Sequence, residues 1–207
     1  MGADEISVNA EGKKLKRLII DCCPREDASA TRRLYRAHPD FCAEGVENEI
    51  LYLSRMELTP LSGEEAALRA RLTAEGESEM KGPLFELAKQ FAAAEEIWIA
   101  APYWDLSFPS LMKVYLERVS VVGVAFCYTD DSGIPKGLCR ADRIRYFCTA
   151  GGPVLRPHQG VEYVKALGLM FGIHRVDEIT VENMDTDPRG REAVLEEGIL
   201  RMKENAL

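Results

Sequence analysis

The chain lacks any hydrophobic run that approaches the ~20 residues needed to cross a membrane as a helix. Its first residues, Met1 to Gly12, are polar and acidic, which is unlike a secretory signal. We therefore expect a cytoplasmic protein with a short disordered lead-in over residues 1–12. The length of 207 residues predicts a single domain, residues 1–207, that buries its own core.

Basic residues are also scarce, since 26 lysines and arginines face 34 aspartates and glutamates and leave a net charge of −8. A nucleic-acid partner needs a basic footprint for its phosphates. This balance therefore excludes nucleic acid as the expected partner and leaves a small molecule or another protein.

No cysteine or histidine pattern typical of a metal site is present. The six cysteines form no C-x-x-C spacing, and the three histidines are far apart in sequence. Scattered thiols in a chain of this size are typical of a reducing cytoplasm. We expect no bound metal.

Two nucleotide-binding motifs are missing as well. The sequence holds neither G-x-G-x-x-G nor G-x-x-x-x-G-K-[ST], which disfavours a Rossmann dinucleotide site and a P-loop.

Apolar runs that alternate with helical patterns are what the chain does contain. Five strands are predicted, at Leu15 to Cys22, Val46 to Leu53, Glu96 to Ala101, Ile144 to Thr149 and Arg175 to Val181. Helices are predicted at about Thr31 to Phe41, Ser62 to Thr73, Pro83 to Ala94, Ser110 to Val122, Gln159 to Phe171, and after Asp187 as cap and Pro188 as first residue. A small hairpin is expected from Ala125 to Cys139. The pattern predicts an α/β fold, a doubly wound five-stranded parallel sheet in the flavodoxin-like order 2-1-3-4-5 with helices on both faces.

Three loops of this sheet are candidates for a binding site, because ligands of open α/β sheets lie at the carboxyl ends of the strands. The first loop ends at Ser29 and Thr31, whose hydroxyls can donate to an anion or simply cap a helix. The second carries Tyr103 and Trp104, and the third ends in a glycine pair. Ser107 or Asp105 is the expected cap of the helix after the second loop, with Pro109 in its first turn.

The second loop also carries a family resemblance. The segment A-P-Y-W-D-L-S-F-P-S from Ala101, followed by K-V-Y-L-E-R-V, G-V-A-F-C-Y-T and T-A-G-G, resembles the FMN-dependent NADH-azoreductases and NAD(P)H quinone reductases. These are flavodoxin-like NAD(P)H oxidoreductases. The resemblance implies FMN as cofactor, NADH or NADPH as electron donor, and ping-pong reduction of a quinone, azo or similar acceptor. It also implies a homodimer, which an apolar helix at Ser110 to Val122 supports.

The resemblance assigns roles to particular residues. It implies that the FMN phosphate is bound by Ser29, Ala30 and Thr31. It implies that the isoalloxazine ring is contacted by Pro102, Tyr103, Trp104, Asp105 and Leu106, and that the pyrimidine edge of the ring is bound by Thr149, Ala150, Gly151 and Gly152. Phe126 and Tyr128 become substrate-pocket candidates that reach a neighbouring subunit. No side chain is predicted to act as acid, base or nucleophile, since the flavin performs the chemistry.

Some features of the sequence leave alternatives open. Glu26 and Asp27 place negative charge near the expected phosphate, which Arg25 would offset. Cys22 and Cys23 stand where some family members have serine, and two small residues ending a buried strand explain them better than a redox pair does. A flavodoxin-type electron carrier, or a flavin-free binding module on the same fold, would share these features.

Overall fold

A computed structural model describes residues 14–129 and 133–205 of the chain. The lead-in expected over residues 1–12 lies outside this range. Among the described residues, no helix combines the length and the apolar character needed to cross a membrane.

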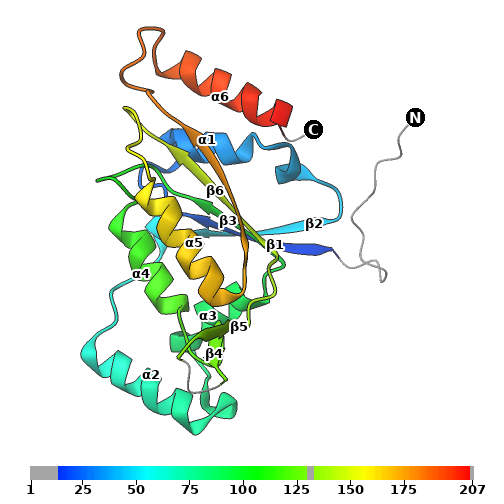
Figure 1. Ribbon diagram of the computed structural model, residues 1–207, viewed down its shortest axis with the longest axis vertical. Coiled ribbons are helices and arrows are strands. Elements are labelled where there is room, and N and C mark those ends of the chain that lie inside the picture. Colours follow the sequence, from blue (N-terminus) through cyan, green and yellow to red (C-terminus); the bar gives the residue numbers. More distant parts are fainter. Residues whose placement is uncertain (1–13, 130–132, 206–207) are drawn as a thin grey trace.

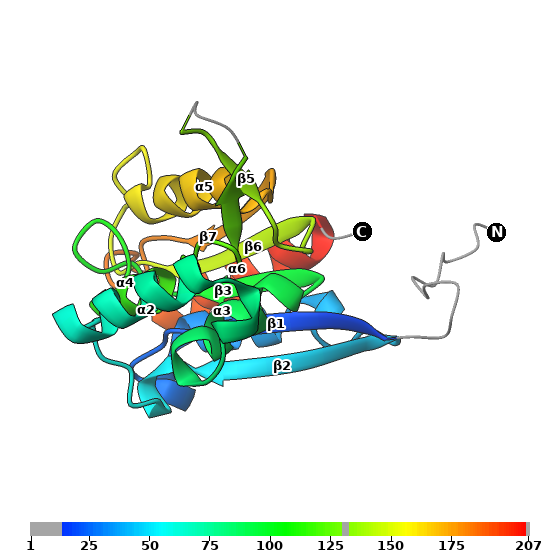
Figure 2. The same cartoon turned by 90° about the horizontal axis from the view of Figure 1, so that it is seen from below.

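Five parallel strands form the central sheet in the order β2-β1-β3-β6-β7, which confirms the predicted topology. The strands are β1 (Leu15–Asp21), β2 (Val46–Tyr52), β3 (Glu96–Ala100), β6 (Arg143–Thr149) and β7 (Arg175–Val181). A separate antiparallel hairpin pairs β4 (Phe126–Tyr128) with β5 (Pro135–Gly137), as expected. Figure 2 shows this hairpin rising beside α5 and away from the sheet.

Helices cover both faces of the sheet (Figure 1). One face carries α1 (Ala30–Arg36) and α6 (Arg191–Asn205). The other carries α3 (Pro83–Ala93), α4 (Ser110–Val119) and α5 (Gln159–Phe171). Outside these layers lies α2 (Gly63–Glu75), which begins with the predicted capping box between Ser62 and Glu65. Short 3-10 turns occupy Glu26–Ala28, Pro39–Cys42, Leu53–Arg55 and Glu77–Glu79.

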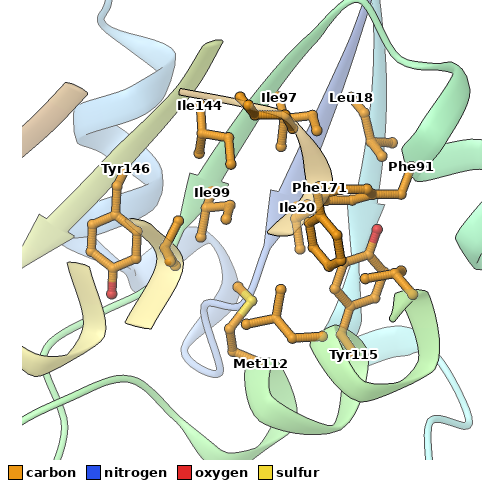
Figure 3. Packing of buried hydrophobic residues seen from close by; sticks show 14 of the residues in the cluster. Leu18, Ile20, Phe91, Ile97, Ile99, Met112, Tyr115, Ile144, Tyr146 and Phe171 are labelled. Carbon is orange, nitrogen blue, oxygen red and sulfur yellow. The ribbon is translucent and has the colours of Figure 1, made fainter. Parts of the chain in front are cut away.

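The central strand β3 is buried on both faces, so its residues are apolar almost throughout. Ile97 and Ile99 pack with Tyr146, Met112 and Tyr115 under α3, α4 and α5 (Figure 3). Trp98 and Phe147 pack on the opposite face under α1 and α6, with ring centroids 4.9 Å apart. Two apolar layers therefore fix the sheet, and its strand ends are placed rigidly.

Three predicted helix boundaries are wrong. The first helix stops at Arg36 rather than near Phe41, because Pro39 cannot donate an amide and restricts the residue before it. Pro109 itself is the N-cap of α4, and neither Ser107 nor Asp105 caps it. The last helix begins at Arg191 instead of Pro188.

The apolar stripe of α4 also has a different role from the one expected. Met112, Tyr115, Leu116 and Val119 are all buried within the chain, where α4 packs against α3 and the sheet. The helix ends at Val119 and does not reach Val122. Its apolar surface is therefore used in the core and gives no argument for a dimer.

The hairpin is held by one very close backbone contact. A Cβ added at Gly137 would lie 2.0 Å from the backbone nitrogen of Gly172, at the end of α5. We expect Gly137→Ala to lower the free energy of unfolding by roughly 1–3 kcal/mol, because backbone cannot yield as a side chain does. Gly63→Ala, where a Cβ would meet nothing within 4 Å, is the matched control and should be neutral. Equal denaturation midpoints for both variants would contradict the contact.

Candidate functional site

Three loops meet at the carboxyl edge of the sheet, because β1, β3 and β6 are neighbours and parallel. Backbone hydrogen bonds join their first residues. The amide of Cys22 donates to the Ala100 carbonyl at 2.9 Å, and the amide of Tyr103 donates to the Thr149 carbonyl at 3.0 Å. The Thr31 and Thr149 hydroxyls lie 2.7 Å apart and share a hydrogen bond. The three segments that the sequence singled out are thus brought together.

The first loop places Ser29, Ala30 and Thr31 at the start of α1, where all three are buried. Ser29 occupies the N-cap position, but its side chain makes no capping hydrogen bond. The amides of Ala30 and Thr31 belong to the first turn of α1 and have no acceptor within the described part of the chain. The side chain of Ser29 therefore does not cap α1.

The acidic residues of this loop are neutralised by arginines other than the expected one. Arg55 holds Glu26 with two hydrogen bonds, of 3.1 and 3.0 Å, and lowers the pKa of that carboxyl. Arg32 lies 3.2 Å from Asp27 and lowers its pKa in the same way. Arg25 forms no ion pair with the described residues. The negative charge that the sequence placed beside this loop is therefore balanced.

A buried polar network around Asp21, behind the loop, was not predicted from the sequence. Asp21, the last residue of β1, accepts hydrogen bonds from the Arg32 Nε at 2.6 Å, the Tyr35 hydroxyl at 3.0 Å and the Cys23 amide at 2.9 Å. Asp21 and Arg32 are both almost fully buried, and the Arg32 Nη2 has no hydrogen-bond partner in the described structure. A charged residue ending an apolar strand was the available signal, because a buried carboxylate needs a partner.

The adjacent cysteines are structural. Both side chains are buried, and burial raises the pKa of the Cys22 thiol to about 12 and that of Cys23 further. The thiolate is the reactive form of cysteine, and this environment disfavours it. The pair fills space at the end of β1, as the sequence favoured.

The second loop contains a tight turn built from residues that rarely form one. Trp104 and Ser107 pair backbone to backbone, with Asp105 and Leu106 between them at φ 48° and 69°. Positive φ at a leucine is uncommon and strained, and such strain is concentrated at functional sites. The turn holds Trp104 and Leu106 in the open, with exposed fractions of 46% and 51%.

The two aromatic residues of this loop, Tyr103 and Trp104, differ in how far they are exposed to solvent. Tyr103 is half-buried, its ring lies against His158 at 5.1 Å, and its hydroxyl accepts from the Leu155 amide at 3.3 Å. Pro102 is also half-buried. Trp104, by contrast, presents its aromatic side chain to solvent at this edge.

The third loop places Ala150 in the core and leaves Gly151 and Gly152 partly exposed. A Cβ at Gly151 would lie 2.3 Å from the Asp185 carboxylate, so the loop after β7 accounts for that glycine. A Cβ at Gly152 would meet nothing within 4 Å, and the amides of both glycines have no acceptor in the described structure. Two amide donors are therefore available here. No sequence pattern indicated Asp185 as a neighbour of this loop.

A cavity of about 460 Å³ opens beside the second loop. Its lining residues are Ser107, Phe108, Lys113, Gln159 and Tyr163. A volume of this order suits a small organic molecule.

The two substrate-pocket candidates are not brought to this edge. Phe126 is buried against Phe171, with ring centroids 6.4 Å apart, whereas Tyr128 is exposed on the hairpin. The hairpin packs at the carboxyl end of α5, while the site loops lie at its amino end (Figure 1).

Metal chemistry finds no support in the described residues, which contain no group of three or more histidine, cysteine, aspartate or glutamate side chains arranged for a metal ion.

The shared hydroxyl hydrogen bond allows a direct test of how the loops are joined. Thr31→Val should lower the free energy of unfolding by about 1–3 kcal/mol, because it leaves the buried Thr149 hydroxyl without its partner. Thr149→Val should do the same. The double variant should lose less than the sum of the two, since both polar partners are then replaced by apolar groups of the same shape. Urea unfolding of the four proteins measures this, and strictly additive losses would contradict the contact.

Known proteins resemble the chain in sequence. A stretch of 126 residues is 34% identical to an FMN-dependent NADH:quinone oxidoreductase of Clostridium beijerinckii and covers 60% of this chain and 63% of that protein. A stretch of 147 residues is 31% identical to an FMN-dependent NADH:quinone oxidoreductase 2 of Clostridium acetobutylicum and covers 69% and 72%. The chain thus spans less than two thirds of the length of the first relative.

Solved structures resemble it in fold. The azoreductase from Bacillus anthracis str. Sterne superimposes with a TM-score of 0.78 at 20% identity and covers 93% of this chain and 98% of its own. An FMN-dependent NADH-azoreductase from Bacillus anthracis str. Ames Ancestor, solved in complex with FMN, gives 0.75 at 19% identity over 93% and 97%. At these identities the likeness concerns the fold.

The family match covers nearly the whole chain. The family described as having a flavodoxin-like fold matches residues 16–206, which include four strands of the sheet in full, β1 from its second residue on, and the three loops at the carboxyl edge. Topology and sequence agree, and the chain belongs to the family of proteins with the flavodoxin-like fold.

Proposed function

We propose that the protein is an FMN-dependent NAD(P)H oxidoreductase that reduces quinone, azo or similar acceptors by ping-pong hydride transfer. The observation that carries the proposal is the meeting of three loops at one sheet edge, joined through Thr149 to Thr31 and to Tyr103. The FMN-dependent NADH:quinone oxidoreductases among its relatives support it.

Each loop would hold a different part of the cofactor. Ser29, Ala30 and Thr31 would hold the phosphate. Trp104 and its neighbours from Pro102 to Leu106 would flank the ring, and the segment Thr149 to Gly152 would hold the pyrimidine edge.

The donor set at the ring end fits FMN. Gly151 and Gly152 offer two unpaired amides, which suit the carbonyl oxygens of a pyrimidine ring. Trp104 offers an exposed aromatic face, and the strained turn at Asp105 and Leu106 holds it there. At the phosphate end, unpaired amides of Ala30 and Thr31 match an anion, and the nearby carboxylates are already neutralised by arginines.

The chain would bind, orient and shield the reactants. When bound, FMN supplies the chemistry, a two-electron transfer from NAD(P)H to the acceptor. The cavity beside the second loop, lined by Phe108 and Tyr163, would receive the flat donor or acceptor. No histidine or cysteine of this edge needs to titrate in such a reaction.

A second copy of the chain would complete the acceptor pocket. Tyr128 and Leu138 of the hairpin region and Leu169 of α5 are exposed apolar side chains far from the site of their own chain. We therefore propose a homodimer in which the hairpin serves the partner through Tyr128, while Phe126 stays buried against Phe171 of its own chain.

We also propose that the protein acts in the cytoplasm. The cysteines of the described residues are all free, as is typical of a reducing compartment.

Flavin uptake and turnover test this function together. Addition of FMN should give a bound flavin spectrum, and the complex should consume NADH or NADPH steadily with a quinone. Trp104→Ala should weaken FMN binding about fivefold, as expected for loss of about 1 kcal/mol of ring contact. Leu200→Ala, an exposed apolar residue on α6, is the matched control and should leave binding unchanged.

Two results would overturn the proposal in distinguishable ways. A protein that takes up no FMN would be a flavin-free binding module. A protein that binds FMN but oxidises NAD(P)H only with a partner reductase would be an electron carrier.

A further inference from the structure

A second cavity lies at the opposite edge of the sheet from the site loops. Its volume is about 560 Å³, and it runs along the whole of β7 between the amino end of β6 and the carboxyl half of α6, with its arginines of β6 and β7 at the amino ends of those strands. Arg143 and Arg145 of β6, Arg175 of β7 and Arg201 of α6 line it. So many arginines around one cavity need explanation in a chain whose net charge is −8.

The strand register makes this concentration of charge costly. Arg143 lies directly beside Arg175 on the neighbouring strand. Like charges at opposed positions of paired strands destabilise a sheet. Two positions further along the strands, Arg145 lies beside Asp177. The unfavourable pair of arginines lies at the amino ends of β6 and β7, of which Arg143 and Arg175 are the first residues.

Nearby carboxylates compensate only part of the charge. Glu96 is shared by three arginines, with Arg17 at 2.7 Å, Arg143 at 2.9 Å and Arg145 at 3.6 Å. Asp40 pairs with Arg145, and Asp177 with Arg175 at 3.1 Å.

The fourth arginine of the cavity is weakly compensated too. Arg201 is 3.8 Å from Glu197, which Arg189 holds more closely at 2.7 Å. Glu178 also lines the cavity, but its carboxylate lies 2.7 Å from Arg156. Positive charge is left in excess.

One donor in this cluster is buried and unsatisfied. The Arg143 Nε is inaccessible to solvent and has no hydrogen-bond partner in the described structure. Its Nη2 lies close to the Glu96 Oε1, yet that oxygen makes no well-aligned hydrogen bond. Buried polar groups left in this state are rare and call for a partner. Glu96 therefore does not fully satisfy the Arg143 guanidinium, although the two groups are in contact.

We propose that this cavity is a binding site for an oxyanion of the phosphate class, such as the diphosphate or phosphate-ester group of a small metabolite. Guanidinium groups form paired hydrogen bonds with such oxygens and remain charged at every physiological pH. The volume is that of a small-molecule site, and an anion would relieve the repulsion between Arg143 and Arg175. Arg143, Arg145 and Arg175 lie at the amino ends of their strands, away from the carboxyl-edge loops, so the proposal does not depend on the flavin function.

Calorimetric titration with pyrophosphate tests the site. The protein is saturated with FMN, so that a phosphate site at the other edge is filled, and sodium chloride of equal ionic strength serves as the blank. Pyrophosphate should bind with one-to-one stoichiometry. Arg175→Gln and Arg201→Gln should each weaken binding by about tenfold or more, since each removes a charged donor.

The matched control is Arg71→Gln, which removes a similarly exposed arginine from α2; the side chains of Arg71 and Arg175 are 61% and 64% exposed. It should leave binding unchanged. Absence of binding, or unchanged affinity in the Arg175 and Arg201 variants, would overturn the proposal. Equal or tighter binding of citrate would overturn the assignment to phosphate. Should one variant fail to fold, the other decides.

Discussion

The arrangement of the loops at the carboxyl edge depends on Thr149, a residue of the third loop that hydrogen-bonds to both of the others. Its carbonyl accepts the Tyr103 amide, and its hydroxyl meets that of Thr31. Both contacts require β1, β3 and β6 to be adjacent and parallel, which the two apolar layers of the core enforce. A shift of one residue in the β6 register would turn Thr149 to the other face and separate the loops. Core packing and the arrangement of the proposed site are therefore linked at this residue.

Arginine shapes both edges of an acidic protein in different ways. At the carboxyl edge, Arg32 and Arg55 neutralise acidic groups, and the buried pair of Asp21 with Arg32 fixes the course of the first loop. Removing one partner of such a pair would leave an uncompensated buried charge. At the amino edge, Arg143 and Arg175 stand side by side without enough carboxylates nearby. In the first arrangement each arginine is paired with a carboxylate, although the buried Arg32 Nη2 has no partner in the described structure. In the second, arginines outnumber the carboxylates that line the cavity, which leaves capacity for an external anion.

Much of the fold could be predicted because its signals are local. Apolar runs ended by Pro24 and Pro102 mark strands, and the spacing of Leu195 and Met202 marks the buried face of the last helix. Features that depend on register or on distant partners could not be read in this way. The neighbouring positions of Arg143 and Arg175, 32 residues apart in sequence, are one example. Gly151 is another, since it makes room for Asp185. The assigned roles of the site residues remain predictions, although the structure brings their loops together.

Mapping of backbone amide shifts during titration with FMN tests the central claim most directly, because it reports every loop at once. Our account predicts that three separate segments respond together at the same FMN concentration. They are 29–31, 102–107 and 149–152, and the arginines at the amino ends of β6 and β7 should not respond with them. Shifts confined to one segment, or centred at the opposite edge of the sheet, would contradict the claim that these loops form one flavin site.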